Sequence, residues 1–459
     1  MPAKTQKCLL CPVSPPLSPD IPTSALPRLF PIFFPTRRLA GENCPRWLTA
    51  ANPGPRRRWM ARATRGSPSS SSAYQILINP PFRSRSRKET KHNHVFQTPS
   101  PQIHDAINLL ISNLVNIEDA TGQFLLRLDD GRVIDTKCWK GWEWTHGIGL
   151  YGVWKYYEMT GDPKLLQIIE DWFAARFAEG GTTKNINTMA VFLTLAYVYE
   201  KTGNVTYLPW LDAWAEWAMH DLPRTRYGGM QHATYVTENY QQLWDDTLMM
   251  TVMPLAKIGR LLNRPEYIAE AKRQFLVHIK YLFDTRTGLF YHGWTFEDGG
   301  HNFANARWAR GNSWVTIVIP EIIELLELEP TDPIRVHLID TLETQCQALQ
   351  RMQASSGFWH TLLDHPDSYV EASATAGFAY GILKAVRKRY IGAQYRAVAE
   401  SAITAVLGAV DEKGELQNTS FGTGMGDSLE FYKKIPLTAM PYGQAMAIMA
   451  LGEYLRTYL

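Results

Sequence analysis

The sequence has few cysteines and carries none of the short signatures of the common cofactor-dependent enzymes. Its 459 residues include five cysteines, and Cys8 and Cys11 form one C-x-x-C without a second pair at zinc spacing. An H-E-x-x-H pair, a phosphate-binding G-x-x-x-x-G-K-[ST] loop and a nucleophile-elbow G-x-S-x-G are absent from the sequence. No Rossmann fingerprint is recognised either, because the GIGLYG at 147–152 lies within a predicted helix. We therefore expect no disulfide framework, no catalytic metal and no cofactor.

The first hundred residues differ in composition from the rest. They hold 16 of the 28 prolines, and 16 of the 47 Lys and Arg residues against 3 of the 44 Asp and Glu residues. The remainder therefore carries 31 basic and 41 acidic side chains. Proline removes backbone donors and restricts the residue before it, and a chain of this composition cannot bury a core. We predict a disordered basic tail over residues 1–100 and a globular domain over residues 101–459.

The basic tail bears on possible partners. It could bind nucleic acid or an anionic membrane, but a solvated tail is the simpler interpretation. The acidic remainder argues against a nucleic-acid partner. The apolar stretch at residues 29–35 is far too short to span a bilayer, so we expect no membrane partner. No signal peptide is readable, and cytoplasm is the default expectation.

The globular part has the pattern of repeated helices. Apolar residues recur at three- and four-residue steps over residues 103–117 and 264–283. Similar stretches begin near residues 146, 163, 187, 207, 242, 313, 334, 372, 393 and 440, which makes about twelve helices. The segment YEMTGD at 157–162 returns as YEKTGN at 199–204, 42 residues later, and a period near 40 indicates helical hairpins.

Such hairpins can form an open solenoid or a closed ring. The long, aromatic and glycine-rich connections at 226–242 and 288–312 favour the ring, because a closed barrel gathers its long loops at one mouth. We therefore predict an all-α fold, an (α/α)6 barrel of six helical hairpins.

Tryptophans and a pair of adjacent carboxylates mark the candidate site. Of 15 tryptophans, 13 follow residue 100, many beside Gly, His, Asp and Arg. This pattern favours a pocket that stacks flat ligands such as sugar rings. Asp245 and Asp246 precede a wholly apolar run, at a predicted helix start. Either they cap the helix, or one of the two, desolvated against Trp and Met side chains, has a raised pKa and serves as a general acid.

Two further residues have open interpretations on sequence alone. His292 lies between aromatics and before a glycine, where it could be a hydrogen-bonded loop residue or part of a site. Arg310 lies between two tryptophans before a helix. It could bind a carboxylate with both arms, or form an ion pair with a neighbouring acid.

An ordered series of motifs resembles glycoside hydrolase family 105, the unsaturated rhamnogalacturonyl hydrolases, which is related to the unsaturated glucuronyl hydrolases of family 88. The resemblance runs from about residue 105 to 459 and rests on WEWTHG (142–147), LWDD (243–246), YHGW (291–294), WARGNSW (308–314), YVEASAT (369–375) and GTG (422–424). It implies an (α/α)6 barrel and a hydrolase that removes a 4,5-unsaturated uronic acid from the non-reducing end of oligosaccharides produced by polysaccharide lyases.

The resemblance also implies roles for individual residues. An Asp protonates C4 and helps water add at C5, and the motif places this acid at Asp246, with His292 as the active-site histidine. The implied substrate-binding residues are two groups: Trp144, Trp244 and Trp314 for stacking, and His232, Arg310 and Asn187 for polar contacts, with Arg310 suited to the uronate carboxylate.

One departure and several alternatives remain. Members of the family often have a second acid on the earlier helix, where this chain reads TKNINT at 183–188, and Asn187 can donate hydrogen bonds but not share a proton. The sequence does not determine which sugar is linked to the uronate. A sugar-binding protein without turnover, or another barrel enzyme such as a sugar epimerase, would use the same fold.

Overall fold

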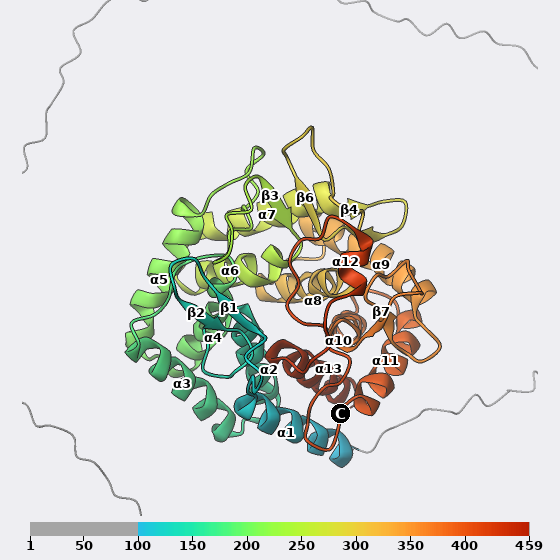
Figure 1. Ribbon diagram of the computed structural model, residues 1–459, viewed down its shortest axis with the longest axis horizontal. Helices are drawn as coiled ribbons and strands as arrows, with labels where there is room; N and C mark the ends of the chain where they lie inside the picture. The colour runs from blue at the N-terminus through green and yellow to red at the C-terminus, as the bar shows by residue number, and fades with distance from the viewer. Residues whose placement is uncertain (1–99, 459) are drawn as a thin grey trace, which may run out of the picture. The chain divides into compact units, whose positions relative to one another are not determined.

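The computed structural model describes residues 100–458, which form a ring of helices (Figure 1). The predicted tail over residues 1–100 lies outside this described part, apart from Ser100, where the first helix begins. Within the described part, no helix is both long enough and apolar enough to cross a membrane.

Six buried helices form the inner ring. Each packs against the next along the chain, and the last packs against the first, so the ring is closed. This closure distinguishes a barrel from an open solenoid. The inner helices are α2 (Trp144–Thr160), α4 (Val191–Thr202), α6 (Met253–Leu261), α8 (Ala309–Leu325), α10 (Ala372–Arg387) and α13 (Pro441–Tyr458).

Six outer helices cover this ring (Figure 1). Asp162 and Asp332 cap two of them by accepting from the backbone two residues on, and a proline follows each in the first turn. The outer helices are α1 (Ser100–Asn116), α3 (Pro163–Ala178), α5 (Leu208–Glu216), α7 (Pro265–Leu282), α9 (Pro333–Met352) and α11 (Arg396–Gly408). Because α1 packs on α13, the two ends of the described chain form the sixth hairpin. The predicted (α/α)6 barrel is confirmed.

The connections differ at the two ends of the barrel. Those that lead into the inner helices are long, and they contain the short helix α12 (Leu429–Lys433) and four two-stranded antiparallel sheets. The paired strands are β1 (Leu125–Arg127) with β2 (Val133–Asp135), β3 (Gln242–Trp244) with β6 (Gly293–Thr295), β4 (Phe283–Asp284) with β5 (Leu289–Phe290), and β7 (Trp359–His360) with β8 (Val370–Glu371).

The helix predicted to start near residue 242 starts later. Gln242–Trp244 is strand β3, paired with β6, and a π-helical turn at Leu248–Val252 precedes α6. The cross-strand pairing of Trp244 with Gly293 takes these residues out of the helical pattern. As a result Asp245 and Asp246 lie between a strand and a helix, at the mouth of the barrel.

Buried ion pairs join the helices near the opposite end. The Glu321 carboxylate on α8 is 3.4 Å from the Lys155 ammonium on α2, and it also accepts a hydrogen bond from the Lys384 ammonium on α10, at 2.5 Å. These two lysines hold the pKa of Glu321 well below its usual range despite burial. The ionic cluster connects three inner helices at the end away from the long loops.

Candidate active site

A cavity of about 520 Å³ opens at the mouth of the barrel, among the long loops. Three of the predicted residues line it: Trp144 at the start of α2, Asn187 in the loop before α4, and Trp244 at the end of β3. The described residues around the cavity include two acids, Glu143 and Asp427, and no Lys, Arg or His. The cavity therefore offers aromatic faces, amides and hydroxyls to a ligand, as a sugar pocket does.

The pairing of β3 with β6 brings two of the predicted motifs together. The backbone N–H of Asp245 donates to the carbonyl of His292 at 3.0 Å. His292 Nε2 lies 3.3 Å from Asp246 Oδ2, and its Nδ1 lies 2.8 Å from the Tyr432 hydroxyl. The His292 side chain is 1% exposed and that of Asp246 12% exposed. Asp246 is the more exposed of the two side chains, and His292 is placed to orient it.

The two adjacent carboxyls have opposite pKa shifts. Burial and the charge of Asp246 raise the pKa of Asp245 well above its usual value. The His292 imidazole lowers the pKa of Asp246 to about 2, against the effect of burial. The expectation that the acid has a raised pKa therefore does not hold for Asp246: the carboxyl with the raised pKa is Asp245.

The alternative that these acids cap a helix is also wrong for Asp245. Neither of its carboxyl oxygens accepts a hydrogen bond from a backbone N–H, and the residue is fully buried. A buried carboxyl without donors is costly as an anion, which is the physical reason for its protonation.

His232 and Trp244 form a stacked unit beside the cavity. Their rings lie 4.2 Å apart and nearly parallel, at 7°. His232 Nδ1 is 2.8 Å from the Thr247 hydroxyl, and burial lowers the pKa of the imidazole to about 3. A neutral His232 therefore supports the Trp244 ring from the side away from the cavity. The expected direct contact between His232 and a sugar does not fit this position.

Arg310 and Trp314 differ from their expected roles in the same way. Both are fully buried and neither lines the cavity. Arg310 donates to the Ser420 carbonyl at 2.9 Å and the Thr423 hydroxyl at 2.9 Å, and lies 3.7 Å from Glu371. Its two terminal nitrogens hold the loop that carries GTG, and its Nε has no partner among the described residues. Buried outside the cavity wall, it is not placed to clamp a uronate there. Its ion pair with an acid, the other interpretation of the sequence, is present.

Trp314 packs edge-on against Trp144, with ring centroids 6.1 Å apart at 85°. The expected stacking of a sugar on Trp314 does not fit its full burial. Trp144, by contrast, lines the cavity and stacks on Tyr442 at 4.5 Å. Trp314 therefore supports the tryptophan that a ligand can reach.

Sequence reasoning missed both acids of the pocket, Glu143 and Asp427, and Glu143 is the more deeply buried. It lines the cavity, is 2% exposed, and bonds the side chain of Asn187. Burial raises the pKa of Glu143 to about 7, because its partners are neutral amides. Its place between two tryptophans in WEWTHG was the available signal.

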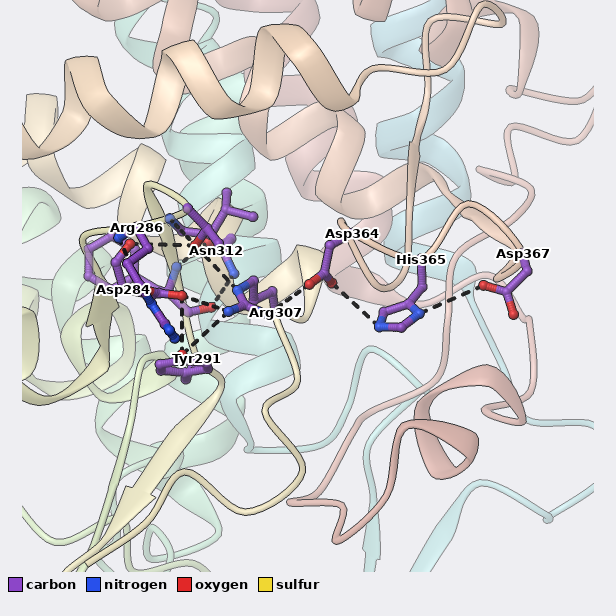
Figure 2. A network of polar contacts seen from close by, with 11 residues as sticks. Asp284, Arg286, Tyr291, Arg307, Asn312, Asp364, His365 and Asp367 are labelled. Carbon is purple, nitrogen blue, oxygen red and sulfur yellow. Dashed lines mark hydrogen bonds and ion pairs between the residues drawn. The ribbon is translucent and has the colours of Figure 1, made fainter.

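A polar network fixes the loop that carries His292 (Figure 2). Arg307 donates to Asp284 at 2.6 Å and to Asp364 at 2.7 Å. The Tyr291 hydroxyl, next to His292, also donates to Asp284, at 3.1 Å. These contacts tie the 283–308 loop to the loop between α9 and α10, so the position of His292 is set by both.

The same cluster has the residue types of a metal site. Among residues 100–458, the ligand atoms of Asp245, Asp246 and His292 all lie within 4.8 Å of one another. The raised pKa of Asp245 belongs to the site without a cation, and a bound cation would favour its ionised form.

Comparison with known proteins agrees with this geometry. The family model for Glycosyl Hydrolase Family 88 matches residues 116–458. The unsaturated rhamnogalacturonyl hydrolase YesR of Bacillus subtilis (strain 168) is 33% identical over 319 residues, 69% of this chain and 90% of that protein.

Two solved structures of possible GH105 family members are also similar. The one from Salmonella enterica serovar Paratyphi A is 62% identical with a TM-score of 0.78, and the match covers 80% of this chain and 99% of that one. The one from Klebsiella pneumoniae is 60% identical with a TM-score of 0.77, over 82% of this chain and 100% of that one. The resemblance seen in the motifs is confirmed, and the chain belongs to Glycosyl Hydrolase Family 88, as a glycoside hydrolase.

Proposed function

We propose that this enzyme removes a 4,5-unsaturated uronic acid from the non-reducing end of oligosaccharides that polysaccharide lyases produce. The observation that carries the proposal is the placement of Asp246 3.3 Å from His292, whose ring contacts Trp244 in the wall of the sugar-sized cavity. A B. subtilis relative is named for this activity on rhamnogalacturonyl substrates. Rhamnose, as in pectin, is therefore our first choice for the linked sugar.

The chemistry requires a proton donor and the controlled addition of water. Asp246, supplied with the proton of Asp245, protonates C4 of the vinyl ether, and water adds its oxygen to C5. The proton of that water returns to the carboxyl pair, so no net charge is left on the enzyme. The hemiketal formed at C5 opens by cleavage of its bond to the ring oxygen, and the hemiacetal at C1 then releases the neighbouring sugar.

The electrostatics of the site suit this sequence. Asp246 is ionised in the free enzyme because of His292. Binding of an anionic uronate nearby raises the pKa of Asp246, since a like charge disfavours ionisation. Protonation of the pocket-facing carboxyl is thereby coupled to the presence of substrate.

The test is an ultraviolet assay on a panel of unsaturated disaccharides that differ in the linked sugar. The conjugated C4=C5 bond absorbs, and hydration removes the signal. We expect wild type to lose absorbance, and Asp246→Asn to be slower by about 10²–10⁴-fold, the usual contribution of general acid–base catalysis. Asp162→Asn, at a helix cap of α3 on the outside, is the control. A folded wild type that leaves every unsaturated disaccharide intact refutes the proposal.

A further inference from the structure

We propose that Glu143 contacts the substrate and donates, as a carboxylic acid, a hydrogen bond to an oxygen of the bound uronate. This inference rests on the proposed function and adds a residue to the same pocket. It gives the enzyme a group whose ionisation weakens substrate binding without taking part in the proton transfer by Asp246.

The position of Glu143 leaves part of its carboxyl available. It precedes α2, and its Oε2 accepts from the backbone N–H of Trp144 at 2.8 Å. The side chain of Asn187 also bonds it, from across the pocket wall. A carboxyl offers about four lone-pair positions. The backbone N–H of His146 also donates to this side chain, in a capping box. Three donors therefore leave one position, for a proton that a substrate oxygen can accept.

The groups around Glu143 contain no cation in contact with it. From α2 it faces His146, whose Nδ1 accepts from the Glu143 backbone N–H at 3.0 Å and whose pKa burial lowers to about 4. From the loop after α5 it faces Tyr235, whose pKa is raised to about 12. Asp427 lines the cavity, and Arg132 lies 5.5 Å from the ring centroid of Tyr235.

The remaining titratable groups of the site belong to the Asp246 cluster. Asp245, Asp246 and His292 lie close to one another, the His292 ring contacts Trp244, and His232 stacks on Trp244. None of them is among the hydrogen-bond partners of Glu143. Burial among neutral donors is therefore the main influence on its pKa, which agrees with the value of about 7.

This environment has a consequence for an anionic ligand. With Arg310 occupied elsewhere and no Lys or Arg among the described lining residues, an ionised Glu143 would repel a uronate. A protonated Glu143 instead donates a hydrogen bond to it, and hydrogen bonds to charged groups are the strong ones. Substrate affinity should therefore fall as Glu143 ionises. A helix cap without substrate contact predicts no such dependence.

The decisive measurement is KM and kcat for an unsaturated disaccharide from pH 5 to pH 9. We expect the wild-type KM to rise by about tenfold per pH unit once the pH exceeds the pKa of Glu143, as for binding that requires one protonated group. In Glu143→Gln the KM should be several-fold higher at pH 6 and flat through the alkaline range, because an amide donates but does not ionise. Asp162→Asn, another helix cap, should keep the wild-type profile.

A second variant protects the test against poor folding of the first. Asn187→Ala removes a hydrogen bond that lowers the pKa of Glu143, so the KM inflection should move to higher pH. A merely structural role for Asn187 moves no inflection. The inference is overturned if wild-type KM is flat, or if Glu143→Gln keeps the wild-type slope. Turnover by wild type in the same experiment supports the proposed function independently of whether Glu143 contacts the substrate.

Discussion

Gly311 on α8 is the most sensitive position behind the catalytic pair. A Cβ built on Gly311 would lie 2.2 Å from Asp245 Oδ2 and 2.6 Å from Oδ1, where ordinary contact begins at 3.4 Å. In Gly311→Ala the carboxyl must therefore move by about 1.2 Å, the difference between 2.2 and 3.4 Å. Its backbone is held by the bond to the His292 carbonyl, so the displacement falls on the side chain and its contact with Asp246.

We expect Gly311→Ala to lower kcat by about 100-fold, the usual effect of a misplacement near 1 Å in a catalytic group. That loss corresponds to about 2.7 kcal/mol of activation free energy. Stability should change less. Overpacking costs about 1–3 kcal/mol, and replacing a helical glycine by alanine returns about 1 kcal/mol. The expected signature is thus a large loss of activity with a small fall in Tm.

The measurements are initial rates of absorbance loss and thermal unfolding on the same preparations. Gly452→Ala on α13 is the matched control, because its Cβ would meet nothing within 4 Å. It should keep wild-type activity and an equal or higher Tm. A Gly311→Ala enzyme with kcat within threefold of wild type would show that Asp245 has room to move, and the argument for a tightly held carboxyl pair would fail.

Two further predictions concern the acid pair and the loop beside it. Asp245→Asn removes the proton that Asp245 supplies, so Asp246 must take its proton from solvent although its pKa is lowered. Activity at pH 7 should therefore fall. In a profile of kcat against pH, the optimum should move to lower pH. A retained optimum would show that Asp245 supplies no proton. Arg307→Ala leaves Asp284 without its main partner and should cost about 3 kcal/mol in urea unfolding at pH 7. Because Arg307 depresses the folded-state pKa of Asp284, this stabilisation is present above about pH 4 and is lost as the pH falls below it. The variant should therefore show a weaker acid dependence of unfolding free energy, and an unchanged dependence would refute this role.

The fold was predictable because its signals are local. Helical periods, capping Asp residues with prolines after them, and a repeat near 40 residues all lie within short windows of sequence. The exception is β3, whose pairing partner β6 lies about 50 residues away. A local pattern of apolar residues cannot distinguish such a strand from the start of a helix.

The site was predictable as a set of residues but not as an arrangement. Asp246, His292 and Trp244 lie together as expected, whereas Arg310 turns into the protein and binds the loop at Ser420. The direction of an arginine depends on acceptors more than 100 residues away, so sequence left both interpretations open. Glu143 was missed because its importance comes from its contact with Asn187 and the cavity, which no spacing reveals.

The opposite pKa shifts of Asp245 and Asp246 show that two adjacent aspartates can have very different surroundings. The two side chains have different neighbours. Asp245 lies against Gly311 in the interior, while Asp246 lies beside His292. One carboxyl is placed where only its neutral form is stable, and the next where an imidazole favours its charge. Under the proposed function, a proton held on the inner carboxyl passes to the outer one when an anionic substrate makes the charge on Asp246 unfavourable. We propose that two adjacent aspartates then act as store and donor without an acid at residues 183–188.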